Sequence, residues 1–462
     1  MLFNSFSFIF AFLPVTLIVY LLLSAYTEKK QSLVWLLIAS LFFYGWWNPS
    51  YLLLITSSIT INFVCSKLIG KQIEARKILF IGIVFNLGLL GYFKYRNFFV
   101  ENINYLFDGF FPYSETVLPL AISFFTFQQI AFLVDTYNEK TYDHGFLKYS
   151  LFVLFFPQLI AGPIVRHQEL IDQFDVNPIN KYLYEKLAKG MTIFSIGLIK
   201  KVIFASQLAG ISDPLFLVAN TQVLSFYEAW IAALAYTFQI YFDFSGYSDM
   251  AIGLALMFGF SIPNNFDTPY RSYSIRDFWR KWHMTLSGFL RDYLYIPMGG
   301  NRHGLFKQAI ALFITMLLGG LWHGASWNFI AWGGLHGCAL WLNQLSNRLN
   351  VHPPKLLGWS ITFLFVLFCW VLFRAETFPT AMNVYYGLVG CHGVGDIPKF
   401  WSKMGIIALA AVFAIIGPSS YSWVHKHLKP NKAIAILLAA LTLAVLLELG
   451  GIDNNEFIYF QF

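Results

Sequence analysis

The chain has 462 residues, of which 57% are hydrophobic, 19% are aromatic and only 12% are charged. In a soluble domain about a quarter of the residues are charged, so this composition excludes an ordinary soluble protein and indicates a polytopic membrane protein. The formal net charge of +7 comes without an arginine-rich stripe or a nucleic-acid-binding module, so no nucleic-acid partner is expected.

Apolar runs of roughly 16 to 22 residues each match one crossing of a hydrocarbon core about 30 Å thick. The first run has no basic residue before it and no cleavage site after it, so we expect a retained helix and not a signal peptide. Some runs are expected to be re-entrant or interfacial, which leaves about 11–13 crossings. In chain order the candidate spans are 3–24, 32–47, 50–66, 78–93, 116–134, 147–165, 186–205, 223–243, 245–261, 307–322, 326–346, 356–373, 403–421 and 432–449.

Basic loops at 28–30, 67–77, 347–355 and 425–432 alternate with poorly basic connections. Loops rich in lysine and arginine stay in the cytoplasm. The pattern therefore predicts that both termini lie outside the cytoplasm and that the segment 276–307 lies on the cytoplasmic side. No stretch is polar enough for a separate soluble domain, so an all-α membrane protein is expected.

The segment SIRDFWRKWHMTLSGFLRDYLYIPMGGNRHG (274–304) has a helical pattern up to Pro297. At about 100° per residue, its large apolar side chains gather in an arc of about 120°. Charged residues occupy the opposite side, so an amphipathic helix at the cytoplasmic boundary is predicted. The apolar arc consists of Phe278, Trp279, Trp282, Leu286, Phe289, Leu290 and Tyr293.

His283 falls at the edge of this apolar face. A lone histidine in such a place is either a hydrogen-bonded structural residue or a functional one, and spacing alone does not separate the two. The polar side is suited to bind the phosphates of an anionic donor, although an interfacial anchor needs the same charges. The residues predicted for donor binding are Arg280, Lys281, Arg291, Asn301 and Arg302.

The segment LLGGLWHGASWNFIAWGGLHG (317–337) places His323 at the junction of two apolar runs, among several glycines. Ionisable residues at membrane depth mark a function by default, and glycines permit either close backbone approach or a cavity against His323. Imidazole can take a proton from a hydroxyl near neutral pH, so His323 is a candidate general base. The alternative is a histidine bonded to a neighbouring helix. His336 would fall on a different face of a continuous helix and is predicted to be structural.

The segment YFDFSGYSDMAIG (241–253) places Asp243 and Asp249 within apolar sequence. Buried carboxylates need partners. These two either brace helices against the cytoplasmic basic segment or form a proton path. The sequence has no metal-ligand spacing, no close cysteine pair and no nucleotide-binding glycine loop, so histidine-centred chemistry without a metal is expected.

These blocks, with PNNFDTPYRS (263–272), AISFFTFQQIAFLVDTY (121–137) and FFPQLIAGPIVRHQEL (155–170), resemble the signature blocks of the membrane-bound O-acyltransferase family. The chain is most similar to the bacterial branch of alginate and peptidoglycan O-acetyltransferases, with the teichoic-acid D-alanylation protein more distant. The resemblance implies a ring of membrane helices around a tunnel, in a bacterial inner membrane. Residues 1–449 would form this domain, with the core signature at 241–337.

The resemblance also implies roles for individual residues. His323 matches the histidine of the family's W-H-G block and His283 that of its W-H-M-T-L-S block, so both are expected to face the tunnel and to be catalytic. Acetyl-coenzyme A would be the acyl donor on the cytoplasmic side, and no bound cofactor is implied. Supporting roles would fall to Asp243, Asp249, Trp282, Asp292, Trp327 and Asn328.

The last residues of the sequence, FIYFQF (457–462), belong to a tail (450–462) that is expected outside the cytoplasm. The tail resembles the aromatic, tyrosine-containing C-terminal motif of a small membrane protein in the related D-alanylation system. By this resemblance Tyr459 would accept the acyl group, because a phenol with a pKa of about 10 deprotonates more easily than a sugar alcohol. An extracytoplasmic, serine esterase-like partner would pass the acetyl group to a cell-envelope polysaccharide. The alternative is an aromatic anchor in the lipid bilayer interface.

Three other functions fit the same sequence. They are D-alanyl or other acyl transfer to teichoic acid, a transporter or flippase, and a non-catalytic membrane assembly subunit. A transporter would move its substrate without consuming a thioester. Neither a transporter nor an assembly subunit would need His323.

Overall fold

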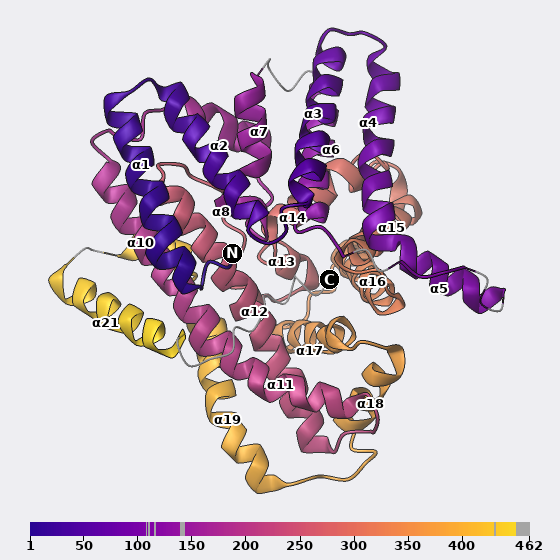
Figure 1. Ribbon diagram of the computed structural model, residues 1–462. Helices are drawn as coiled ribbons and strands as arrows, with labels where there is room; N and C mark the ends of the chain where they lie inside the picture. Colours follow the sequence, from indigo (N-terminus) through magenta and orange to yellow (C-terminus); the bar gives the residue numbers. More distant parts are fainter. Residues whose placement is uncertain (108, 110, 115–116, 139–143, 429–430, 450–462) are drawn as a thin grey trace. The chain divides into compact units, whose positions relative to one another are not determined.

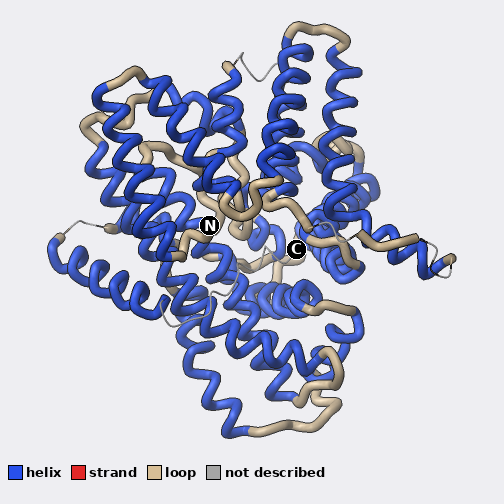
Figure 2. Tube along the Cα trace, in the orientation of Figure 1, coloured by secondary structure: helices blue, strands red, loops and turns tan. Residues whose placement is uncertain are grey.

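The computed structural model describes residues 1–462 except 108, 110, 115–116, 139–143, 429–430 and 450–462. Every regular element in these described residues is a helix, and none of them is a strand (Figure 2). The all-α class predicted from the sequence is therefore confirmed. The described chain falls into two compact units.

The first unit comprises Met1–Ser195 and Tyr247–Pro263. Its helices α3 and α4 lie side by side and run in opposite directions (Figure 1). The helices of this unit, the last of which continues into the second unit, are η1 (Ser7–Phe12), α1 (Leu13–Tyr26), α2 (Lys29–Gly45), α3 (Tyr51–Gly70), α4 (Ala75–Leu90), η2 (Gly91–Tyr95), α5 (Arg96–Leu106), α6 (Ile122–Tyr137), α7 (Phe146–Leu154), α8 (Phe156–Leu159), α9 (His167–Leu170), η3 (Ile171–Asp175) and α10 (Leu183–Ile199).

The second unit comprises Ile196–Gly246 and the described residues from Asn264 on. It contains all the described residues of the candidate active site except Asp249. Helix α12 (Phe226–Met257) begins in this unit and ends in the first. The other helices are η4 (Lys200–Ala205), α11 (Ser206–Ala219), η5 (Pro269–Arg271), α13 (Ile275–Trp279), α14 (Met284–Leu290), η6 (Arg291–Tyr295), α15 (Gly304–His323), α16 (Trp327–Arg348), α17 (Lys355–Arg374), α18 (Phe378–Leu388), α19 (Ile397–Ala411), η7 (Val412–Ile416), α20 (Ser420–Ser422), η8 (Trp423–His427) and α21 (Lys432–Leu449).

Seven helices of the described chain are long and apolar enough to cross a membrane. The number becomes eight if Phe400–Ile416 and Ser420–His427, which meet at a bend of 57°, form one span. The prediction of a polytopic membrane protein is therefore confirmed. Helix α2, which the sequence analysis counted as a further crossing, has only 17 residues. The seven helices are Ser7–Tyr26, Tyr51–Gly70, Ala75–Leu106, Leu183–Ala219, Gly304–His323, Lys355–Arg374 and Lys432–Leu449.

The two spans predicted at 223–243 and 245–261 are one continuous helix, α12, of 32 residues. The break predicted at residue 244 was therefore wrong. Every residue from 235 to 258 is buried. A helix that is apolar on all sides is suited to a protein interior as well as to lipid. The apolar composition of this stretch thus reflects burial within protein along a single long helix.

Candidate active site

The segment predicted to be one amphipathic helix up to Pro297 is broken in the structure into α13, α14 and η6. Between α13 and α14 the chain pairs with an upstream loop. The Asp267 amide donates to the Lys281 carbonyl oxygen (2.9 Å), and the Met284 amide donates to the Asn265 carbonyl oxygen (3.0 Å). These bonds replace helical ones, so the prediction of a continuous helix was wrong.

The break lies at His283, whose φ of 42° is in the left-handed region. A residue with a Cβ pays about 1–2 kcal/mol for this conformation, so the surrounding contacts must hold it. His283 is fully buried and not at the edge of the apolar face. The face itself is as predicted, because all of its residues are buried except the half-buried Tyr293.

Asn265 fixes the position of the proton on the His283 ring. Thr285 donates to Asn265 Oδ1 from its backbone amide (3.4 Å) and from its hydroxyl (2.9 Å), which identifies this atom as the amide oxygen. His283 Nδ1 lies 3.0 Å from the same oxygen and must be a donor to it. In the neutral ring the lone pair is then at Nε2, which is buried and has no hydrogen-bond partner among the described residues.

Burial lowers the pKa of His283 to about 3, because desolvation disfavours the charged imidazolium. The short helices on either side, α13 and α14, have 5 and 7 residues and cannot span a membrane. The ring is therefore neutral at physiological pH. Its Nε2 is a weak base but a competent hydrogen-bond acceptor.

His323 is the last residue of α15 and lies among aromatic rings. It is 4% exposed. Its ring centroid lies 4.9 Å from that of Trp322, 5.2 Å from that of Trp332 and 5.2 Å from that of Phe373. The helix stops because Gly324 adopts an extended conformation. The chain then turns and enters α16, which supplies Trp332.

Glycines allow α15 and α16, which lie side by side in Figure 1, to approach closely. A Cβ on Gly320 would lie 2.1 Å from the Phe329 carbonyl oxygen, and a Cβ on Gly333 would lie 2.2 Å from the Met316 carbonyl oxygen. No side chain fits at such distances, so the predicted role of the glycines in close packing is confirmed. The approach brings Trp332 against the imidazole at the end of α15.

Trp322 contacts both predicted catalytic histidines. Its ring centroid is 6.3 Å from that of His283 and 4.9 Å from that of His323. One imidazole comes from the turn between α13 and α14, and the other comes from the end of α15. The structure therefore brings the two residues to one aromatic side chain.

His336 belongs to the same cluster. Its ring is fully buried and lies 4.6 Å from that of Trp332 and 5.3 Å from that of Trp279. Trp279 Nε1 donates a hydrogen bond to His336 Nδ1 (3.2 Å). The prediction that His336 faces away from His323 assumed a continuous helix. That premise was wrong because the chain turns between α15 and α16.

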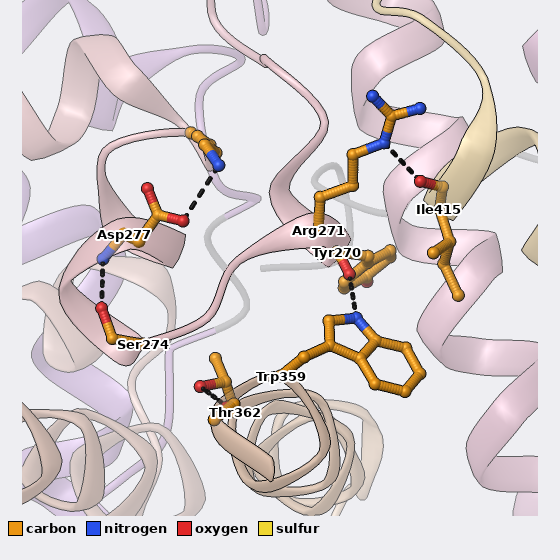
Figure 3. A network of polar contacts seen from close by, with 9 residues as sticks. Tyr270, Arg271, Ser274, Asp277, Trp359, Thr362 and Ile415 are labelled. Atoms are coloured by element: carbon orange, nitrogen blue, oxygen red, sulfur yellow. Dashed lines mark hydrogen bonds and ion pairs between the residues drawn. The ribbon is translucent and has the colours of Figure 1, made fainter. Parts of the chain in front are cut away.

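The loop before α13 is anchored by the polar contacts drawn in Figure 3. The Arg271 guanidinium donates to the Ile415 carbonyl oxygen of η7 (Figure 3). It also donates to the carbonyl oxygen of Gly417, the residue after η7, at 2.9 Å. The indole of Trp359, from α17, donates to the Tyr270 carbonyl oxygen at 2.9 Å. These bonds fix the start of the segment that carries His283.

The residues predicted to bind an anionic donor differ in their partners. Lys281 forms an ion pair with Asp277 (2.9 Å), and Arg291 forms one with Asp292 (2.6 Å). Two of the cations are therefore already balanced by a carboxylate close in sequence. The exposed members of the set are Arg280, Arg291, Asn301 and Arg302.

Asp243 forms a buried ion pair with Lys201 of η4, at exposures of 1% and 5%. Lys201 was missed in the sequence analysis, although a charged residue inside the predicted span 186–205 was a usable signal. Asp249 is 6% exposed and belongs to the first unit. The two predicted carboxylates therefore lie in different units.

The remaining supporting residues have unequal environments. Trp282 is buried, with its ring 4.9 Å from that of Trp370. Asn328 is buried and donates to the Ala375 carbonyl oxygen (2.8 Å), which ties the start of α16 to the end of α17. Trp327, by contrast, is 60% exposed.

Sequence reasoning also missed Asn265 and Trp332. Asn265 lies within a block that carried the family resemblance, but only its pairing across the turn reveals that it orients His283. Trp332 resembled any other aromatic residue of an apolar run. Tyr459, the third predicted catalytic residue, lies outside the described residues together with the rest of the tail.

The fold and this site define the class of the protein. It is a helical, multi-pass membrane protein in which two buried histidines contact one tryptophan. The family model described as "MBOAT, membrane-bound O-acyltransferase family" matches residues 42–386. The chain therefore belongs to this family and is an acyltransferase. That assignment decides against the transporter and the non-catalytic assembly subunit.

Named relatives are similar over most of the chain. The peptidoglycan O-acetyltransferase of Helicobacter pylori is 46% identical over 432 residues, covering 85% of this chain and 81% of the relative. The probable alginate O-acetylase AlgI of Pseudomonas aeruginosa is 44% identical over 398 residues, covering 83% of this chain and 74% of the relative. The teichoic acid D-alanyltransferase of Streptococcus thermophilus is more distant, at 28% identity over 281 residues, 55% of this chain and 68% of the relative.

Proposed function

We propose that the enzyme takes an acetyl group from acetyl-coenzyme A on the cytoplasmic side of a bacterial inner membrane and delivers it outside. The product is an O-acetylated cell-envelope polysaccharide of the alginate or peptidoglycan kind. The observation that carries the proposal is the pair of buried histidines at Trp322 in an O-acyltransferase. The names of the relatives support acetyl as the acyl group.

In the proposed reaction His323 acts as the general base. It takes the proton of the hydroxyl whose oxygen attacks the thioester carbonyl carbon. The new C–O bond forms, the C–S bond breaks, and the leaving thiolate receives the proton from His323. The aromatic rings around His323 keep water away from the thioester, which limits its hydrolysis.

His283 has a different role in this proposal. Its pKa of about 3 makes it a poor proton carrier near neutral pH. Its Nε2 lone pair, held in place by the bond from Nδ1 to Asn265, instead accepts a hydrogen bond from the donor and orients it. The exposed Arg280 and Arg302 bind the phosphates of the donor.

The attacking hydroxyl is proposed to be that of Tyr459. An acetyl-tyrosine ester keeps much of the transfer potential of the thioester, because a phenolate is a better leaving group than an alkoxide. A serine esterase-like partner outside the cytoplasm then takes the acetyl group and passes it to the polysaccharide. The aromatic neighbours of Tyr459 in the tail would seat it by burying apolar area.

The donor is tested with purified enzyme in nanodiscs, by measuring free thiol after acetyl-coenzyme A is added. Thiol release is expected in the wild type and in His352→Ala, because His352 is exposed in a loop. It is expected to be lost in His323→Ala. Release that is absent from the wild type, or equal in all three proteins, would overturn the proposed donor and base.

The acceptor is tested by mass spectrometry of the C-terminal peptide after the same incubation. An added acetyl group is expected on the wild-type tail and on that of Tyr386→Phe, a change at an exposed tyrosine of α18. Tyr459→Phe is expected to lose both the tail acetylation and envelope acetylation in cells. Envelope acetylation that survives this change would leave only the membrane-anchor role for the tail.

A further inference from the structure

Within the described part of the chain, two buried N–H donors of the aromatic cluster that contains His323 lack an acceptor. The Trp332 indole Nε1 and the His336 Nε2 have no hydrogen-bond partner among the described residues. Trp332 is 1% exposed and His336 is 0% exposed. A buried donor without a partner costs about 1–3 kcal/mol, so two of them side by side are costly to keep.

The His336 nitrogen is a donor because of its other hydrogen bond. An indole Nε1 can only donate, so the bond from Trp279 Nε1 shows that His336 Nδ1 carries a lone pair. A charged imidazolium has protons on both nitrogens and cannot accept this bond. The ring is therefore neutral and its proton is on Nε2.

The two donors share one helix, and Trp332 contacts both His336 and the proposed base. Trp332 and His336 are four residues apart on α16, so their side chains lie on the same face. The Trp332 ring is 4.6 Å from that of His336 on one side and 5.2 Å from that of His323 on the other. An oxygen that develops negative charge during attack at this place would meet two fixed donors in surroundings from which water is excluded.

We propose that the Trp332 Nε1–H and the His336 Nε2–H form the oxyanion hole for the thioester carbonyl. This inference rests on the proposed acetyl transfer and assigns two further catalytic residues to it. Trp279 acts as a positioning residue, because its indole holds His336 in the tautomer that donates.

The electrons and protons of the step balance. The hydroxyl oxygen bonds to the carbonyl carbon, and the C=O π electrons move to the carbonyl oxygen. The resulting oxyanion accepts hydrogen bonds from the two donors while His323 takes the hydroxyl proton. When the oxyanion collapses, the C=O bond re-forms, the C–S bond breaks and the thiolate takes the proton from His323.

The first test removes one donor and keeps an aromatic ring. Trp332→Phe is expected to lower kcat about 100-fold or more, with KM for acetyl-coenzyme A within about threefold, because the donor acts in the transition state. The matched control is Trp370→Phe, a buried tryptophan of the same aromatic cluster whose indole donates to the Tyr270 hydroxyl (3.1 Å). The control is expected to keep kcat within about fivefold of the wild type.

The second test measures binding without turnover. One probe is the amide analogue of acetyl-coenzyme A, in which NH replaces the thioester sulfur and the carbonyl is kept. The other is ethyl-coenzyme A, a thioether that lacks the carbonyl. The wild type and Trp370→Phe are expected to prefer the amide about three- to tenfold, the worth of one or two hydrogen bonds. Trp332→Phe is expected to lose most of that preference.

The outcomes separate the two proposals. If Trp332→Phe and Trp370→Phe lower kcat equally, or if the wild type does not prefer the amide, the oxyanion hole is wrong while the acetyl-coenzyme A donor stands. If the wild type binds neither probe, the proposed donor is wrong and this inference falls with it. If Trp332→Phe does not fold, a wild type without this preference still overturns the oxyanion hole.

Discussion

The two proposed catalytic histidines are held in place by different physical means. His283 sits in a turn with a left-handed backbone, and its orientation depends on hydrogen bonds that converge on Asn265. His323 ends a regular helix, and its orientation depends on packing against Trp332 and Phe373. The first arrangement is polar and depends on a bond to an upstream loop, whereas the second depends on the close approach of α15 and α16.

This difference separates the two roles. A ring whose proton is fixed at Nδ1 and whose charged form is disfavoured is suited to accept a hydrogen bond without changing state. The ring of His323 is instead positioned by the aromatic rings around it. We therefore expect polar substitutions to harm the His283 region, and substitutions that change volume to harm the His323 region.

The largest expected effect is at His323. His323→Ala removes the proposed general base and is expected to lower kcat about 1,000-fold or more. His283→Ala removes only an orienting acceptor and is expected to lower it about 10- to 100-fold. Single-turnover thiol release measures both. Equal losses in the two variants would abolish the distinction between their roles.

The next effect concerns the packing that supports His323. Gly320→Ala places a Cβ 2.1 Å from the Phe329 carbonyl oxygen and is expected to destabilise the protein by about 3 kcal/mol. Gly334→Ala is the control, because its Cβ would meet only the Phe313 ring at 3.5 Å. It is expected to be neutral or slightly stabilising, since alanine favours a helix. Thermal unfolding in detergent compares the two, and equal midpoints would contradict the packing argument.

A smaller effect is expected at the polar anchor of His283. Asn265→Ala removes the acceptor that fixes the Nδ1 proton and is expected to lower kcat about 10- to 100-fold. The neighbouring Asn264 bonds only locally, to the Phe266 carbonyl oxygen (2.9 Å). Asn264→Ala is therefore expected to keep most of the activity. The idea fails if both variants have the same rate.

The pH dependence of stability should also identify the buried neutral ring. The pKa of His283 in the folded protein, about 3, is below the ordinary value of 6.5. As the pH is lowered, the imidazole is therefore protonated in the unfolded chain before it is protonated in the folded one. His283 therefore costs no stability above about pH 6.5, and stability falls by up to about 1.4 kcal/mol per pH unit below it. His283→Gln lacks this term, so its acid unfolding is expected to be shallower. Parallel curves for the two proteins would refute the expectation.

The smallest effect concerns the backbone of the turn. At a φ of 42° glycine is unstrained, whereas alanine keeps the Cβ penalty. His283→Gly is therefore expected to be more stable than His283→Ala by about 1 kcal/mol, which is the reverse of the order inside a helix. Denaturant titration of both variants measures the difference. A more stable alanine variant would show that the turn relaxes once the imidazole is removed.

Much of the fold follows directly from the sequence. Long apolar runs with few charges indicate helices. In a helix every backbone polar group is hydrogen-bonded within its own segment, as an apolar environment requires. The same rule does not distinguish lipid from protein interior. For this reason residues 223–261 looked like two crossings, whereas they form the single buried helix α12.

The site was predictable only in part. His323, His283 and the glycines around α15 stand out because polar or small residues in apolar sequence need a reason. Asn265 and Trp332 do not stand out, because their roles arise from contacts between segments that lie apart in the sequence. The continuous helix assumed for His336 does not exist, because α15 ends where Gly324 adopts an extended conformation.

The sequence by itself determined the helical membrane class, the family and the identity of two candidate catalytic histidines, because each of these depends on residue type and local spacing. Only the tertiary structure decided which atoms of those histidines carry protons, which tryptophan both of them contact and where two unpartnered donors lie. Those properties depend on hydrogen-bond partners and neighbouring rings contributed by other segments. No local pattern specifies such partners, because folding alone brings them together.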